Sequence, residues 1–175
     1  MLPILYLILA MVLVVVDQFT KLWAASYLRD AGHVVELIPG VFEFRYCENR
    51  GVAFSLLEGQ KWLFIPLTLI AAALMVALLF RSPLRRRWLF SLPCALILAG
   101  GIGNLIDRIA YGYVIDFLYF RLIDFPIFNF ADCCVVVGAF LLFGFLLFGL
   151  KGEEDTPLRT LLLGISVKEK EKKDG

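Results

Sequence analysis

Two aspartates, Asp116 and Asp132, lie in short polar motifs between apolar segments of the chain. An ionisable side chain next to lipid is costly, so such a residue is first a candidate for function. Two neighbouring carboxylates do not both ionise cheaply, and a pair that shares one proton can act as acid and base on a water molecule. The two residues therefore suggest an acid–base site that hydrolyses a bond.

Four long apolar stretches must position these aspartates. The chain has 175 residues, of which 61% are hydrophobic, and its mean hydropathy is +0.83. The uncharged stretches cover residues 2–16, 62–80, 88–106 and 133–150. A helix needs about 20 residues to cross the hydrocarbon core, and lipid cannot hydrogen-bond an open backbone. Each stretch, extended by its flanks, therefore predicts a transmembrane helix. The first has no basic start and no small-residue exit, so we expect a resident helix and not a cleaved signal peptide.

The distribution of basic residues predicts the orientation. Arg81 and residues 85–87 crowd the linker between the second and third stretches, and Lys and Arg recur after residue 150. The positive-inside rule places both regions, and with four spans both termini, in the cytoplasm. Residues from about 24 to 60 and from about 109 to 131 then face outside. We expect one domain, residues 1–150, followed by a mixed-charge cytoplasmic tail, residues 151–175.

In this topology the polar residues of the spans converge at the outer end. Asp17 and Lys21 are four apart on one helix face, so they can form an ion pair; an anchor whose Lys21 snorkels to the headgroups is an equally simple interpretation. The third stretch ends in Asn104, Asp107 and Arg108. The Arg108 guanidinium can bind a carboxylate or phosphate, and Asp107 is a possible structural partner for it.

Local patterns add a turn, a strand and a helix start. Asn49-Arg50-Gly51 is typical of a turn. Residues 34–46 alternate partly, which indicates a short strand of a structural hairpin on the outer membrane surface. Asn129 and Asp132 are three apart, so either could cap the last helix.

The remaining reactive residues do not suggest metal or thiol chemistry. The four cysteines form no Cys-x-x-Cys pair, and His33 is the sole histidine. Zinc ligation and a Cys–His dyad are therefore poorly supported. We expect no metal, no other cofactor and no nucleic-acid partner.

Five motifs together resemble the lipoprotein signal peptidase (signal peptidase II) family of bacterial intramembrane aspartyl proteases. They occur in the family's order, over residues 1 to about 150. They are DQFTK at 17–21, NRGVAFS at 49–55, GNLIDR at 103–108, VIDF at 114–117 and FNFAD at 128–132. The glycine run at 99–104 departs from the family's usual pattern by exchanging small residues, and the tail is longer than the family core requires.

The resemblance implies an all-α integral membrane protein with four transmembrane helices and a small extracytoplasmic β-sheet platform. It implies cleavage of diacylglyceryl-modified prolipoproteins just before the lipidated cysteine, at the outer face of the bacterial cytoplasmic (inner) membrane, with phospholipids around the protein and globomycin-type inhibitors blocking it. It also implies three sets of residues. The catalytic pair is Asp116 and Asp132; substrate is bound by Asn49, Asn104, Arg108 and Asn129; and the site is supported by Asp17, Lys21, Gly103 and Asp107.

Two other functions use some of the same features. A small transporter or proton-coupled channel also uses intramembrane carboxylates, but the inner halves of the spans are almost wholly apolar and offer no polar path. A scaffold subunit built on the glycine packing face would leave both aspartates and Arg108 unexplained.

Overall fold

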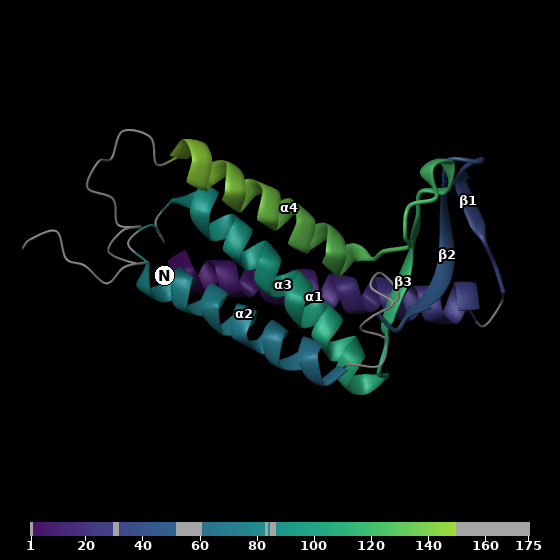
Figure 1. The fold of residues 1–175 in the computed structure, drawn as a ribbon, viewed down its shortest axis with the longest axis horizontal. Coiled ribbons are helices and arrows are strands. Elements are labelled where there is room, and N and C mark those ends of the chain that lie inside the picture. The colour runs from purple at the N-terminus through teal and green to yellow at the C-terminus, as the bar shows by residue number, and fades with distance from the viewer. Residues whose placement is uncertain (1, 30–31, 52–60, 83, 85–86, 150–175) are drawn as a thin grey trace, which may run out of the picture.

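The structure is a computed structural model that describes residues 2–29, 32–51, 61–82, 84 and 87–149 (Figure 1). The expectations for residues 85–86, for the outer loop at 52–57 and for the tail at 151–175 fall outside the described residues.

Among the residues that the structure describes, four helical segments are long and apolar enough to cross a membrane, which confirms the four expected helices. They are α1 (Leu2–Trp23), continued by η1 (Ala24–Arg29), α2 (Lys61–Arg81), α3 (Trp88–Ala110) and α4 (Phe130–Gly144), continued by η5 (Phe145–Gly149). The first extends far beyond its uncharged stretch because Ala24 and Leu28 pack against Ile115 and Phe117 of the sheet.

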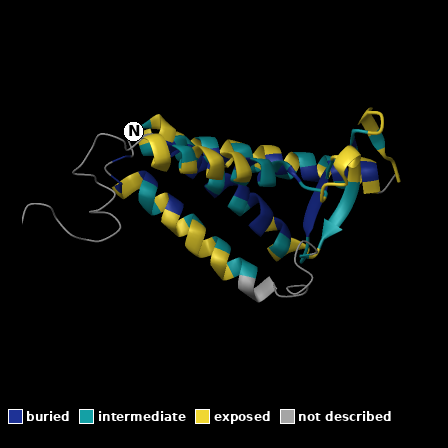
Figure 2. Cartoon of the chain, turned by 45° about the horizontal axis from the view of Figure 1, so that its top comes forward, coloured by how far each residue is buried: buried dark blue, intermediate teal, exposed yellow. Residues whose placement is uncertain are grey.

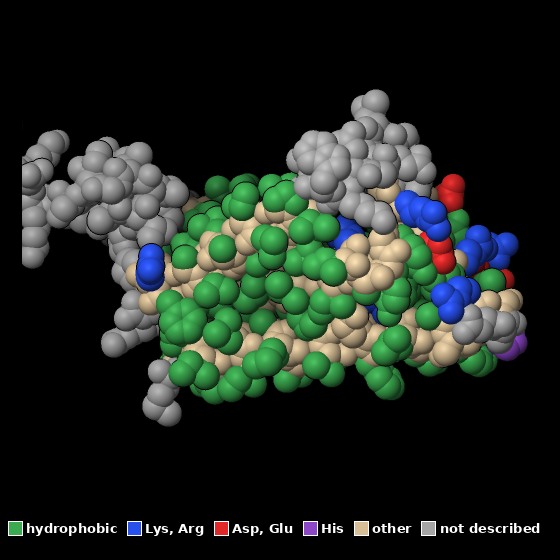
Figure 3. Space-filling model, turned by 90° about the horizontal axis from the view of Figure 1, so that it is seen from below, with side chains coloured by type: hydrophobic (Ala, Val, Ile, Leu, Met, Phe, Trp, Pro, Cys, Tyr) green, Lys and Arg blue, Asp and Glu red, His purple; other side chains and the backbone are tan. Residues whose placement is uncertain are grey.

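The third helix, α3, is the centre of the bundle. In the most apolar stretch of α3, 61% of the residues are buried inside the protein. The corresponding share is 11% in α1, 11% in α2 and 22% in α4 (Figure 2). On the face seen in Figure 3, hydrophobic side chains cover the helices, and charged side chains gather at the sheet end. An apolar exterior around a helical bundle is what lipid as a solvent requires.

Glycines allow α3 to approach α4 and α1 closely. A Cβ atom on Gly100 would collide with the carbonyl oxygen of Ala131 and the side chain of Val135. A Cβ on Gly103 would lie 2.5 Å from Asp17 Oδ2. The glycine run therefore serves helix packing, as small residues commonly do in membranes.

A three-stranded antiparallel sheet lies across one end of the bundle (Figure 1). Its strands are β1 (Val35–Ile38), β2 (Phe42–Asn49) and β3 (Val114–Tyr119), in the order β1-β2-β3. Gly40, at a φ of +71°, lies in the turn between β1 and β2, so the expected hairpin is present. The third strand, β3, pairs Asp116 with Cys47 of β2 across the sheet.

Candidate active site

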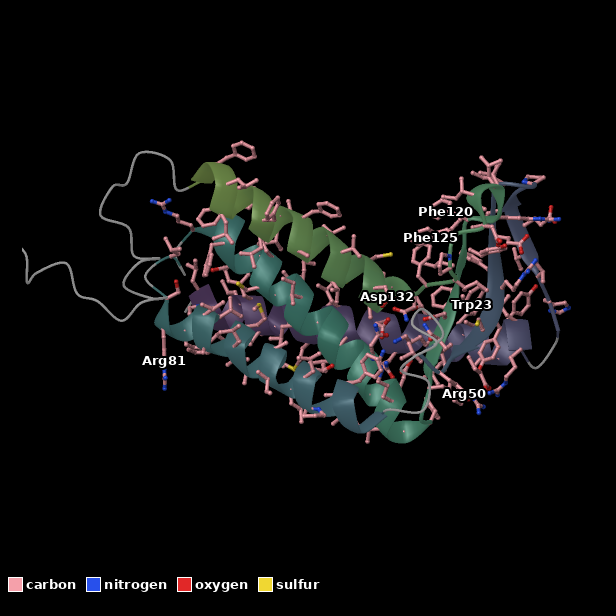
Figure 4. All side chains as sticks on the ribbon, viewed as in Figure 1. Trp23, Arg50, Arg81, Phe120, Phe125 and Asp132 are labelled. Atoms are coloured by element: carbon pink, nitrogen blue, oxygen red, sulfur yellow. The ribbon has the colours of Figure 1, made fainter. Side chains whose placement is uncertain are left out.

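Asp116 and Asp132 are presented by different elements that meet at the sheet end of the bundle. Asp116 lies in the middle of β3, and Asp132 lies in the first turn of α4, which begins close to the sheet (Figure 4). Asn129 is the N-cap of α4: its Oδ1 accepts the Asp132 N–H at 2.9 Å, and its own N–H donates to Asp132 Oδ2 at 3.1 Å. This reciprocal capping box fixes the Asp132 side chain at the helix start.

Two buried amides connect the aspartates. Asn129 Nδ2 donates to Asp116 Oδ1 at 2.6 Å and to Asn104 Oδ1 at 3.0 Å. Asn104 Nδ2 donates in turn to Asp132 Oδ1 at 2.7 Å. Asn129 is 0% exposed and Asn104 is 8% exposed, so these hydrogen bonds are made away from bulk water. The two carboxyl groups therefore belong to one hydrogen-bond network.

Asn49, at the end of β2, completes the surroundings of Asp116. Its Nδ2 donates to Asp116 Oδ2 at 2.8 Å, and its Oδ1 accepts the Gly51 N–H at 2.9 Å. Gly51 has a φ of +104°, which only glycine adopts readily, so the turn predicted at Asn49-Arg50-Gly51 orients the amide. Each oxygen of Asp116 thus accepts an amide N–H.

The environment of Asp116 favours its protonated form. The residue is 1% exposed. Burial, and then the negative charge of Asp132, raise the pKa of the Asp116 carboxyl to about 7, although hydrogen bonds from Asn49 and Asn129 and the charge of Lys21 act against the shift. The pair therefore retains a proton close to neutral pH, as general acid–base chemistry requires.

A buried cluster of three charges lies beside this network. Lys21 Nζ is 2.9 Å from Asp17 Oδ2 and 3.0 Å from Asp107 Oδ2, and it donates to Asn104 Oδ1 at 2.9 Å. Of the two interpretations of Asp17 and Lys21, the structure contains the ion pair. The alternative of a snorkelling anchor is wrong, because the Lys21 side chain is 1% exposed. Asp107 pairs with Lys21, so the suggested pairing with Arg108 is not what the structure contains.

Arg108 lies four residues after Asn104 in α3, at a cavity between α2, α3 and α4. Its Nη1 donates to the Asn104 carbonyl at 3.2 Å, and its guanidinium carbon lies 5.2 Å from the centre of the Phe64 ring. The cavity has a volume of about 300 Å³ and is lined mainly by apolar side chains, among them Leu67 and Ala71. Asn104, Arg108 and Asp132 supply its polar end. This is the usual composition of a site that binds a largely apolar ligand.

The structure gathers the predicted site residues at one end of the bundle. Gly103 contributes by leaving room for the Asp17 carboxylate. Sequence reasoning missed Gln18, whose Nε2 donates to Asp17 Oδ2 at 3.2 Å and to Asp107 Oδ1 at 3.0 Å. Its place inside the DQFTK motif was the available signal. Within the described residues, no cluster of three or more His, Cys, Asp or Glu residues is arranged to hold a metal ion.

Comparison with known proteins places this geometry in context. A family model described as signal peptidase (SPase) II matches residues 9–148. The lipoprotein signal peptidase of Lactiplantibacillus plantarum is 42% identical over 142 residues, which cover 81% of this chain and 93% of the relative. That of Symbiobacterium thermophilum is 43% identical over 139 residues, which cover 78% and 90% of the two chains. A solved bacterial membrane enzyme superposes with a TM-score of 0.76 at 28% identity, over 86% of this chain and 92% of the other.

Proposed function

The chain belongs to the signal peptidase II family, and from this premise we propose that Asp116 and Asp132 are the catalytic pair with which it hydrolyses its substrate. Its activity is that of an aspartic peptidase that removes signal peptides from prolipoproteins, and it is a multi-pass bacterial membrane protein. The observation that carries the proposal is the pair of amides, Asn104 and Asn129, through which the two carboxyl groups share one network.

The two carboxyl groups hold one water molecule and one proton between them. The ionised carboxylate takes a proton from the water, while the protonated carboxyl transfers its proton to the oxygen of the scissile carbonyl. The water oxygen attacks the carbonyl carbon and gives a gem-diol. Collapse of the gem-diol breaks the C–N bond: the pair takes a proton from one hydroxyl of the gem-diol and delivers a proton to the leaving amine. The pair titrates as a unit throughout.

The polar residues around the pair position the peptide. Asn104 and Asn129 hold the carboxyl groups, and Arg108 presents its guanidinium at the polar end of the cavity. A guanidinium at this place stabilises the negative charge that develops on the carbonyl oxygen and binds the substrate backbone. Asn49 contributes from the sheet side, where it donates to Asp116.

The cavity explains a preference for lipidated substrates. The apolar part of the cavity continues away from Asp132 between α2, α3 and α4. An acyl chain of a diacylglyceryl cysteine occupies it, and the bond just before that cysteine then reaches the carboxyl pair. Each buried methylene adds about 0.8 kcal/mol, so lipid supplies affinity that a short peptide lacks. Globomycin-type inhibitors bind at the same polar end, and membrane phospholipids surround the helices.

The proposed orientation places the site at the outer face of the cytoplasmic membrane and both termini inside. It is supported by Arg81, which lies at the end of α2 far from Asp132 (Figure 4). In a background without the native cysteines, a membrane-impermeant maleimide should label a Leu122→Cys variant on intact cells, because Leu122 is 70% exposed near the sheet. An Arg81→Cys variant should react only after the cells are lysed. The reverse pattern would overturn the orientation.

The catalytic proposal is tested with Asp116→Asn and Asp132→Asn. Both variants should fold and lose cleavage of a lipidated precursor, measured as a mobility shift on a gel. Asp124→Asn is the matched control, since Asp124 is exposed, lies outside the site and has a φ of 48° that asparagine accepts readily. Retained cleavage by either site variant would refute the catalytic pair.

A further inference from the structure

We propose that Lys21 is a positioning residue that sets the relative placement of Asp116 and Asp132 through two carboxylates, Asp17 and Asp107. We refer to Asp17, Lys21 and Asp107 as the clamp. The inference rests on the proposed catalytic role of the two aspartates, and it assigns the clamp a task in the reaction beyond stabilising the bundle.

One side of the clamp holds the helix that carries Asp132. The Lys21 ammonium binds Asp17 Oδ2 at 2.9 Å, and Asp17 Oδ1 accepts the backbone N–H of Ala131 at 2.9 Å. Ala131 is the residue immediately before Asp132. Its N–H is one of the donors at the start of α4 that have no acceptor within the helix. The helix dipole also favours a carboxylate at this place.

The other side of the clamp holds the strand that carries Asp116. The same ammonium lies 3.0 Å from Asp107 Oδ2, and that oxygen accepts the backbone N–H of Ile115 at 3.0 Å. Ile115 is the residue immediately before Asp116. A single charge in α1 is therefore connected, through one carboxylate on each side, to the peptide groups that precede both aspartates.

A third contact of Lys21 orients an amide of the site. Its ammonium donates to Asn104 Oδ1 at 2.9 Å, so the amide nitrogen of Asn104 must face Asp132, to which it donates at 2.7 Å. An ammonium has donors only, so it excludes the flipped amide that would turn an oxygen toward Asp132. Lys21, together with Asn129 Nδ2, which donates to the same oxygen at 3.0 Å, thus determines that Asp132 meets the nitrogen of the Asn104 amide.

Stability alone is a poor explanation for this arrangement. All three clamp side chains are 1% exposed, and a buried ion cluster often contributes no more stability than apolar residues of similar volume. Helix packing at this level also does not require both carboxylates to bind the peptide groups next to the aspartates. Catalysis does require such contacts, because the reacting groups must be held in place to a fraction of an ångström.

The experiment compares kcat and KM per folded molecule for the full chain with a lipidated precursor. Lys21→Met should lower kcat by about 10²-fold, the size expected for a misplacement of about 1 Å, and leave KM within about threefold. Asp17→Ala should do the same, and Asp17→Asn should recover part of kcat because its amide oxygen can still accept the Ala131 N–H.

A second route disturbs the clamp without changing a charge. A Cβ on Gly103 would lie 2.5 Å from Asp17 Oδ2, so Gly103→Ala should also lower kcat at nearly constant KM. Gly144→Ala is the matched control in α4, because its Cβ would meet nothing within 4 Å, and it should leave kcat unchanged. This pair decides the question even when Lys21→Met does not fold.

The proposal is overturned when folded Asp17→Ala and Gly103→Ala keep the parent kcat, or when their losses appear only in KM or in the folded fraction. These outcomes are separate from failure of the catalytic pair, which Asp116→Asn and Asp132→Asn report directly. Cleavage by those two variants would overturn both proposals, whereas their inactivity beside fully active clamp variants would overturn the clamp alone.

Discussion

Asn129 Nδ2 donates to Asp116 Oδ1 over 2.6 Å, so the N-cap of the helix that carries one aspartate also holds the other aspartate. Asn129 uses its oxygen for the cap and its nitrogen for the site. The start of α4 and the middle of β3 are thereby connected by one side chain that is 0% exposed.

The two tasks of Asn129 can be separated by substitution. A serine at an N-cap is about as favourable as asparagine, whereas alanine costs about 1 kcal/mol. We expect Asn129→Ser, which keeps the cap, to unfold at a higher temperature than Asn129→Ala but to lower kcat by about 10²-fold, because no amide donor reaches Asp116. Asn129→Ala should lose both. Thermal unfolding in detergent and precursor cleavage measure the two effects, and an active Asn129→Ser protein would contradict the role of the amide.

The activity should decline as the pH rises through about 7. The pair works with one shared proton, and burial together with the charge of Asp132 raises the pKa of Asp116 to about 7. Above that pH the shared proton is lost, and no acid remains to polarise the carbonyl. The pH dependence of kcat/KM for a lipidated precursor measures this limb.

A substitution of Asn49 tests whether the loss of activity at alkaline pH follows the pKa of Asp116. The Asn49 hydrogen bond favours the ionised carboxylate and so lowers the pKa of Asp116. In Asn49→Ala the pKa should rise, and the alkaline limb should move to higher pH even though the overall rate falls. Asp132, Asn129 and Lys21 remain in place as the other groups that act on Asp116. A limb that stays or moves to lower pH would show that another group titrates there.

The close contact between α3 and α4 should be sensitive to a single methyl group. Gly100→Ala forces a Cβ against the Ala131 carbonyl and the Val135 side chain, and overpacking of this kind costs about 1–3 kcal/mol. Gly101→Ala is the neighbouring control, since its Cβ would lie 3.5 Å from Thr68 Cγ2, an ordinary contact. Thermal unfolding should show a lower midpoint for the first variant only. Equal unfolding midpoints for the two variants would mean that α3 and α4 move apart without loss of stability.

The sequence predicted those features of the site that depend on short spacings or on the order of motifs. Four apolar lengths predicted four helices, and spacing of four residues left open either the Asp17–Lys21 pair that the structure contains or a snorkelling anchor. Spacing of three residues indicated that Asn129 or Asp132 caps the last helix. The structure shows that Asn129 is the N-cap and that the Asp132 side chain bonds back to its N–H, so both take part.

Long-range partners were not predictable in the same way. The sequence allows Asp107 as a structural partner of Arg108, yet consecutive residues of a helix point to different faces, and Asp107 instead meets Lys21 of another helix. The pairing of Cys47 with Asp116 depends on the strand register, which shifts between Phe44 and Cys47. No local sequence pattern predicts this shift. Gln18 escaped notice because a neutral amide at a helix position is ordinary until its partners are known.

The cavity beside Asp132 yields the last prediction. Ala71 of α2 lines the cavity, and its neighbour Ile70 is 67% exposed on the outside of the bundle. Ala71→Phe should fill space that an acyl chain of the substrate occupies, whereas Ile70→Phe adds a ring toward lipid. Displacing two methylenes from the cavity, at about 0.8 kcal/mol each, corresponds to about a tenfold loss of affinity. We therefore expect KM for a lipidated precursor to rise about tenfold in Ala71→Phe with little change in kcat, because the carboxyl pair is untouched. Ile70→Phe should keep both constants.

Steady-state kinetics with precursors of two acyl lengths would check the assignment of the cavity to the acyl chain. A precursor with a shorter chain should be less affected by Ala71→Phe, and an equal effect on both lengths would mean that the acyl chain lies elsewhere.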